Sequence, residues 1–131
     1  MTKTEIMQTS DMYVIKAKSK TTTAVTAKRF HVFDTSGWAQ AGAGARGPHG
    51  VPVESVAAPA SGQSDIEILL EGTCKVEKAA GALNQGTYVK SDANGKAVAW
   101  VGGVDELEIA AGVVVEDAAN DDTEVMIKLI K

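Results

Sequence analysis

The two histidines and the single cysteine are the side chains of this sequence best suited to act as a general base or a nucleophile. His31 lies in a run of β-forming residues, and His49 lies in a glycine-rich loop. Nucleophilic catalysis would need one of them beside a serine or a thiol. The serines have no recognisable elbow motif around them, and Cys74 lies in an alternating strand pattern, where packing is the better interpretation. The sequence therefore predicts that the protein is not an enzyme.

Gly42, Gly44 and Gly47 match the G-x-G-x-x-G motif of dinucleotide-binding loops. In such a site the glycines follow a strand and open a helix, whose N-terminal amides hold the pyrophosphate. The residues that follow here read PHGVP and cannot open a helix. We therefore interpret residues 41–50 as a flexible loop and expect no cofactor.

Four carboxylates, Asp117, Asp121, Asp122 and Glu124, lie close together near the end of the sequence. Calcium and magnesium take several oxygen ligands from loops of this kind. The spacing does not follow the D-x-[DN]-x-[DN]-G pattern, however, and no glycine provides the sharp turn. We interpret the cluster as a solvated acidic loop and expect no metal.

Composition narrows the class of protein further. The 131 residues carry a formal net charge of −4, which favours neither nucleic acid nor an anionic membrane as a partner. The sequence has no long apolar run for a membrane helix and no apolar stretch of a signal peptide. Hydrophobic residues make up 44% of the chain but aromatic ones only 5%, so we expect a thin core and further burial on assembly.

The elements that must position these residues repeat along the chain. Three groups of residues recur in the same order: Asp34, Gly37 and Ala39 as Asp92, Gly95 and Ala97, then Gly50, Val51, Val53 and Glu54 as Gly112, Val113, Val115 and Glu116, then Ile66, Ile68 and Leu70 as Val125, Ile127 and Leu129. The spacing changes only in the connections, where surface loops tolerate changes of length. We interpret the chain as two copies of one β unit, at residues 24–71 and 82–130.

Alternating apolar residues and regular turn signals predict a mostly β fold, similar to a small barrel or sandwich. Residues 1–11 carry no periodicity, whereas Met12–Lys18 alternates and bears lysines on one side, as edge strands do. Asn94-Gly95 is the strongest hairpin signal, and only Val104–Ala111 could form a helical turn. Further strands are expected at residues 28–34, 51–54, 65–71, 73–77, 87–91, 96–101, 112–116 and 124–130. We expect an N-terminal arm and edge strand over residues 1–18, then a single β domain over residues 19–131.

Trp38 is open to two interpretations. The repeat matches it to Lys96, just after the turn glycine, and a position that accepts lysine is expected to face solvent. Exposed tryptophan is enriched at binding hot spots. Alternatively, the two copies differ in environment and Trp38 fills one end of the core. Trp100 lies in an alternating run, where a core position is expected.

From Tyr88 to Leu129 the sequence resembles head decoration proteins of the phage lambda type. The matching runs are VKSDANGKAVAWVGG and AAGVVVEDAANDDTEVMIKL. The tandem arrangement as a whole, from residue 24 to residue 130, resembles the small capsid cement proteins of phages. The features that carry this resemblance are the D-x-[SN]-G-x-A turns, the AGAGARGPHGV loop, and the GVxVE strands with acidic loops after them.

The resemblance implies a β-rich structural protein of the virion that binds the outer surface of the expanded capsid and stabilises it. The implied partners are the major capsid protein and further copies of the chain, often three at a local threefold position. Synthesis is expected in the host cytoplasm, and nucleic acid and membranes are not expected partners. The chain departs from the lambda type in having two units and an N-terminal arm. The arm and the exposed aromatic are expected to carry the contact, and the predicted interface residues are Tyr13, Ile15, Lys16, Lys18 and Trp38.

Two other binding roles suit a small β repeat. A tail or fibre adaptor would be expected to show an extended trimeric stalk pattern, which this sequence lacks. A carbohydrate-binding module needs exposed aromatic residues at matched spacing, and two tryptophans and two tyrosines offer few. Binding to sugars on an array would separate this second alternative from capsid binding.

Overall fold

The computed structural model describes residues 12–130, which form short antiparallel strands joined by loops. The strands are β1 (Tyr13–Lys18), β2 (His31–Asp34), β3 (Gly37–Gln40), β4 (Val51–Pro52), β5 (Asp65–Glu71), β6 (Thr73–Glu77), β7 (Tyr88–Ser91), β8 (Ala97–Ala99), β9 (Gly112–Val114) and β10 (Glu124–Leu129). Within the described residues the one helical element is the 3-10 turn η1 (Leu107–Ile109), inside the segment expected to turn helically. The mostly β prediction is confirmed, and the sheets stay open. No helix of this described part is long and apolar enough to cross a membrane.

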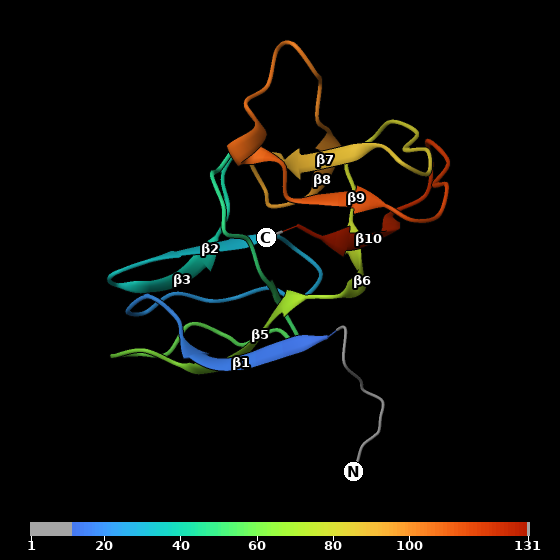
Figure 1. Cartoon of the computed structure of the whole chain (residues 1–131). Helices are drawn as coiled ribbons and strands as arrows, with labels where there is room; N and C mark the ends of the chain where they lie inside the picture. Colours follow the sequence, from blue (N-terminus) through green and yellow to red (C-terminus); the bar gives the residue numbers. More distant parts are fainter. Residues whose placement is uncertain (1–11, 131) are drawn as a thin grey trace.

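The strands form two units that follow one another along the chain. In the first unit β5 lies between β1 and β4, and β2 and β3 form a hairpin beside that sheet. In the second unit the strands pair in the order β6-β10-β9-β7-β8. Figure 1 shows the first unit in the lower part of the view and the second in the upper part.

Strand pairing repeats residue by residue between the two units. The equivalent pairs are His31–Gly50 with Val89–Gly112, Val51–Leu69 with Val113–Lys128, and Val25–Val56 with Leu83–Ala118. β1 also pairs with β5 as β6 pairs with β10, since Ile15 lies opposite Ile68 and Cys74 lies opposite Ile127. The prediction of two similar units is therefore confirmed, and the structural repeat begins earlier than the sequence matches, at β1.

The turns that follow β2 and β7 both begin with an aspartate, but they differ in length. The carboxylates of Asp34 and Asp92 each accept a hydrogen bond, at 2.8 Å, from the backbone amide two residues further on. Gly37 already begins β3, whereas Gly95 still lies in its turn and β8 begins at Ala97. The second turn is therefore one residue longer, and the two matched glycines are not structurally equivalent.

The extra turn residue makes Ala97, rather than Lys96, the counterpart of Trp38. Both residues form the isolated parallel bridge that links the ends of a unit, Trp38 with Ser19 and Ala97 with Lys78. Both are buried, and Trp38 is only 5% exposed. The prediction that Trp38 is an exposed aromatic is therefore wrong. Trp38 instead fills one end of the core, which was the alternative interpretation.

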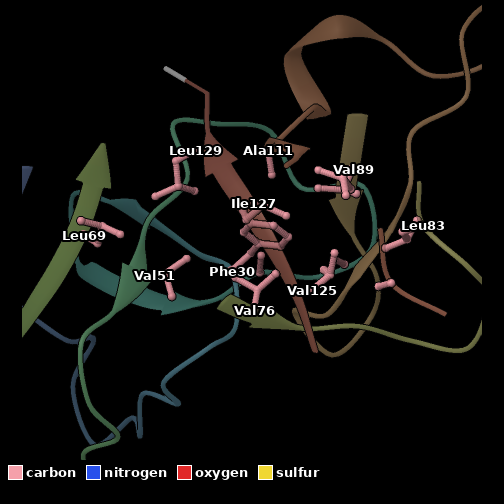
Figure 2. Packing of buried hydrophobic residues seen from close by; sticks show 14 residues of the cluster. Phe30, Val51, Leu69, Val76, Leu83, Val89, Ala111, Val125, Ile127 and Leu129 are labelled. Atoms are coloured by element: carbon pink, nitrogen blue, oxygen red, sulfur yellow. The ribbon is translucent and has the colours of Figure 1, made fainter. Parts of the chain in front are cut away.

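Buried apolar side chains form two clusters. The larger one is centred on the second unit, and the first unit contributes Phe30, Ala41, Val51 and Leu69 to it. Figure 2 shows Phe30 in the middle of this cluster, beside Ile127. The smaller cluster lies within the first unit and consists of Val25, Trp38, Ile66 and Ile68. Because the larger cluster draws on both units, their relative position is fixed by core packing.

Gly50 and Gly112 are equivalent residues at close approaches between strands. A Cβ atom on Gly50 would lie 2.4 Å from Cγ2 of Ile68 and 3.0 Å from Cζ3 of Trp38. A Cβ atom on Gly112 would lie 2.8 Å from Cδ1 of Ile127. Any larger residue would therefore displace core side chains in either unit, which explains why the Gly-Val dipeptide recurs.

Candidate docking surfaces

The two histidines have structural roles in separate places. The ring of His31 is buried; its Nδ1 lies 3.0 Å from the carbonyl of Arg29, and its Nε2 lies 3.3 Å from the amide of Thr26. His49 is also buried, with Nε2 at 2.9 Å from the carbonyl of Ala45. Burial lowers the pKa of both imidazoles, which favours their neutral forms. Each ring therefore holds nearby loop backbone in place through hydrogen bonds.

Cys74 is half buried in β6, and burial raises the pKa of its thiol to about 11. The thiol is therefore protonated at neutral pH, and a protonated thiol is a poor nucleophile. This agrees with the packing role inferred from its strand pattern.

Three of the four carboxylates of the acidic cluster bind groups of the protein itself. Asp117 accepts a hydrogen bond from the amide of Gln85 at 2.7 Å, and Asp122 accepts one from the amide of Ala119 at 2.8 Å. Glu124 forms an ion pair with Lys28. Within residues 12–130 no group of three or more histidine, cysteine or acidic side chains is placed to hold a metal.

The glycine-rich loop, residues 41–50, lies against the second unit. The amide of Gly44 donates to the carbonyl of Ser91 at 2.9 Å, and the amide of Gly47 donates to the carbonyl of Glu108 at 3.0 Å. Arg46 adds an ion pair with Glu106 at 2.6 Å. These contacts make the loop a connection between the two units.

β1 carries four of the five predicted interface residues and is the outer strand of its sheet, as predicted. Tyr13, Lys16 and Lys18 are exposed, and Lys18 forms an ion pair with Asp65. Ile15 is half buried against the smaller core cluster. The fifth residue, Trp38, lies inside that cluster and does not reach the surface of β1. The N-terminal arm itself, residues 1–11, lies outside the described residues.

One side of β1 opens onto a hollow of about 340 Å³. Exposed Met12, Val14 and Val53 line it, and Lys28 and Lys75 belong to the same lining, which contains no acidic residue. Lys16 extends from β1 on the side of Val14, because these two residues are two positions apart in one strand. We call this surface the strand face, defined by Met12, Val14, Lys16, Val53 and Lys75. It combines apolar area with the charges of Lys16 and Lys75, and Glu67 lies directly opposite Lys16 on β5.

A second apolar surface runs along the junction of the two units. One hollow is lined by Tyr13, Phe33, Pro48, Leu70 and Ile130, among others. A neighbouring hollow shares Pro48 and Ile130 and continues to Tyr88, Leu107 and Ala110. The two hollows together form what we call the furrow, defined by Tyr13, Phe33, Pro48, Leu70, Tyr88, Leu107 and Ile130. Four of these side chains, Tyr13, Phe33, Tyr88 and Leu107, are exposed large hydrophobic residues.

Phe33 is a furrow residue that the sequence analysis did not single out. It lies opposite Trp38 across the β2–β3 hairpin, with ring centroids 4.6 Å apart, and it is 50% exposed. Both aromatic residues therefore share one face of the hairpin, and the tertiary contacts bury Trp38 and leave Phe33 at the surface. The alternation of the strand could have identified the pair but not which member is covered.

The connection between β8 and β9 contains a braced loop, residues 100–109. Asp105 binds Lys90 through both carboxylate oxygens, at 2.9 and 2.8 Å, and accepts a hydrogen bond from the amide of Val101. The Lys90 ammonium holds the pKa of Asp105 below its usual range. Trp100, expected in the core, is instead half buried, and its Nε1 donates to the carbonyl of Glu106 at 2.8 Å. The loop backbone is thus held by Asp105 and Trp100 of the loop itself and by Lys90 of β7.

The apolar side chains of this loop point to solvent. Val104 is 80% exposed and Leu107 is 70% exposed. Figure 1 shows the loop rising above the second unit at the top of the view. Exposed apolar groups on a fixed backbone lose little conformational entropy on binding, so the loop is suited to docking.

The chain is similar to known phage proteins. The family model of phage cement proteins matches residues 7–129. The chain is also similar to a solved structure described as the head fiber gp8.5 N base in bacteriophage phi29, with a TM-score of 0.66, 16% sequence identity, and coverage of 90% of this chain and 95% of that one. At this identity the likeness shows a shared fold. A search of the curated proteins gives no match.

Proposed function

Because the chain belongs to the phage cement protein family, we propose that it binds the outer surface of the expanded capsid by contacting the major capsid protein. The resemblance inferred from the sequence is confirmed at the level of the family. Membership makes the protein a structural component of the phage particle that binds and stabilises the capsid. The finer proposal concerns which side of the shell it occupies, which protein it contacts and through which surface.

The observation that carries the proposal is the strand face. An edge strand offers backbone groups for pairing, and this one adds exposed apolar side chains, Met12 and Val14, next to positive charge on Lys16. A surface of this kind suits an acidic, partly apolar area of an assembled shell. Of the predicted residues, Lys16 lies on this face and Lys18 beside it, whereas Tyr13 and Ile15 point to the opposite side of β1.

Binding of this kind stabilises a shell without any reaction. A protein that binds the expanded lattice and not the unexpanded one favours the expanded state by mass action, by about 2.7 kcal/mol per site at one hundred times Kd. The effect is repeated at every site of the lattice, so modest contacts are sufficient. We further propose that copies associate with one another on the shell, as three at a threefold position.

The test is sedimentation of the purified protein with expanded and unexpanded shells. The wild type is expected to sediment with expanded shells only. Val53→Asp places a charge in the strand face and should weaken binding at least about tenfold, the effect of losing a contact of about 1.4 kcal/mol. Ala93→Asp, on the exposed turn after β7, is the matched control and should bind normally. Lys16→Glu should weaken binding at low salt, with a smaller effect at high salt.

Equal binding by Val53→Asp and Ala93→Asp would remove the strand face from the proposal. Absence of wild-type binding to either kind of shell would contradict external capsid binding. Sugar binding on an array without shell binding would instead support the carbohydrate-binding alternative.

A further inference from the structure

The two units of the chain meet in a head-to-tail contact. The 41–50 loop of the first unit lies on the second unit, where Gly44 donates to the carbonyl of Ser91, the last residue of β7. The hydroxyl of Ser91 in turn lies 3.5 Å from the carbonyl of Ala41. One unit therefore supplies a donor loop and the other supplies a receiving hairpin, β7–β8. The surfaces on the two sides of this contact are different, as in heterologous interfaces.

The repeat provides a second donor loop. The 100–109 loop follows β8 as the 41–50 loop follows β3. Within residues 12–130 there is no third unit for it to lie on, and its tip remains exposed at Val104. The Lys90–Asp105 pair fixes the loop in this position even so. The second unit thus presents a formed donor with an apolar tip.

The repeat also provides a second receiver. Ser91 pairs with Ala97 across the second hairpin, and Phe33 pairs with Trp38 at the equivalent place in the first. Phe33 is therefore the counterpart of Ser91. Ser91 is buried by the loop of the first unit, whereas Phe33 is 50% exposed and lines the furrow. The first unit thus presents an unoccupied receiver with an apolar surface.

From these two exposed halves we infer that the 100–109 loop of one copy packs against Phe33 and the adjoining furrow of a second copy. The contact repeats between chains the arrangement that the 41–50 loop makes within one chain. Val104 supplies the apolar tip, and Phe33, Tyr13 and Ile130 supply the apolar receiver. The inference rests on the proposed function because it names the surfaces through which capsid-bound copies associate.

A contact of this type has a geometric consequence. Each copy gives one loop and receives another, so association continues until the rotation between copies closes a ring. A ring of three would match the threefold arrangement proposed above. Because Leu107 of the donor loop itself lines the furrow, the rotation between copies, and not the contact alone, decides how many copies close the ring.

The test is a disulfide cross-link between two different variants in a Cys74→Ala background. One protein carries V104C and the other, with a size tag, carries F33C. Mixing and mild oxidation should yield a disulfide-linked product of both sizes. A93C in place of V104C is the control, and it should yield at least tenfold less of that product. Equal yields with V104C and A93C would overturn the inference.

A second measurement leaves the receiver unchanged. Val104→Asp alters a side chain that is 80% exposed, so folding should be unaffected while sedimentation analysis shows a shift from oligomer to monomer. Unchanged association of Val104→Asp would overturn the inference as well. Shell binding of the wild type is measured separately. If the wild type binds expanded shells but the V104C and F33C variants give no cross-link, even on the shell, the loop contact is contradicted and the capsid-binding proposal stands.

Discussion

Replacement of Trp38 by alanine should destabilise the protein by about 3–5 kcal/mol, the usual cost of removing a large buried aromatic side chain. Trp38 is 5% exposed and packs with Val25, Ile66 and Ile68, while the ring of Phe33 covers its outer side. A buried tryptophan removes about 150–250 Å² from water, which corresponds to about 4–6 kcal/mol at about 25 cal/mol per Å². Residual burial in the unfolded chain reduces this by about 10–40%.

The assay is urea unfolding followed by circular dichroism, with shell binding measured on the same variants. Trp38→Phe keeps most of the apolar area and should lose less stability than Trp38→Ala. Trp100→Ala is the comparison for a half-buried tryptophan and should also lose less. A loss below about 1 kcal/mol for Trp38→Ala, together with weak shell binding, would refute the core assignment and restore Trp38 as a surface hot spot.

Three further predictions test the packing and the titratable groups. Gly50→Ala should cost about 1–3 kcal/mol or more by overpacking, whereas Gly42→Ala, where a Cβ meets nothing within 4 Å, should be nearly neutral in the same urea titration. Burial lowers the folded-state pKa of His31 and His49, so the unfolded state binds protons first and stability should fall as the pH drops below about 6.5; an unfolding midpoint that rises on acidification would contradict this. Burial raises the pKa of Cys74 to about 11, so a maleimide should label it much faster in urea than in buffer, and equal rates would show an accessible thiol.

Local patterns in the sequence predicted most of the strands. The alternation of apolar residues placed β5 and β6 at the bounds that the structure shows, and Asn94-Gly95 lies in the turn between β7 and β8. Pro52 indicated a strand at an edge or a strand start, and β4 is the outer strand opposite β1. These features depend on neighbouring residues, so a single sequence carries them.

The error over Trp38 arose from the length of one turn. Gly37 and Gly95 are aligned in the sequence repeat, but their conformations differ. Gly37 has φ 122° at the start of a strand, and Gly95 has φ 76° within a turn. The same residue type serves both conformations because glycine accepts positive φ in either. The pairing of Trp38 with Lys96 therefore assumed a register that only hydrogen bonding between strands decides.

The surfaces proposed for docking could not be read from the sequence either. The furrow combines β1, the β2–β3 hairpin, the 41–50 loop and residues near both ends of the second unit. Its residues are close only because the two units pack together. The alternation of a strand shows which residues share a face, but whether that face is covered depends on the other unit.

The contrast between the internal contact and the proposed external one has a physical reason. Within one chain the second unit is tethered to the first, so its effective concentration is high and the contact needs little affinity. That contact consists of backbone hydrogen bonds from Gly44 and Gly47, a surface ion pair at Arg46, and only small apolar residues, Ala41 and Ala45, at the larger core cluster. Two separate copies must instead overcome the entropy of association, and burial of apolar area is the main favourable term available. The proposed pairing of an apolar tip at Val104 with an apolar receiver at Phe33 meets this requirement.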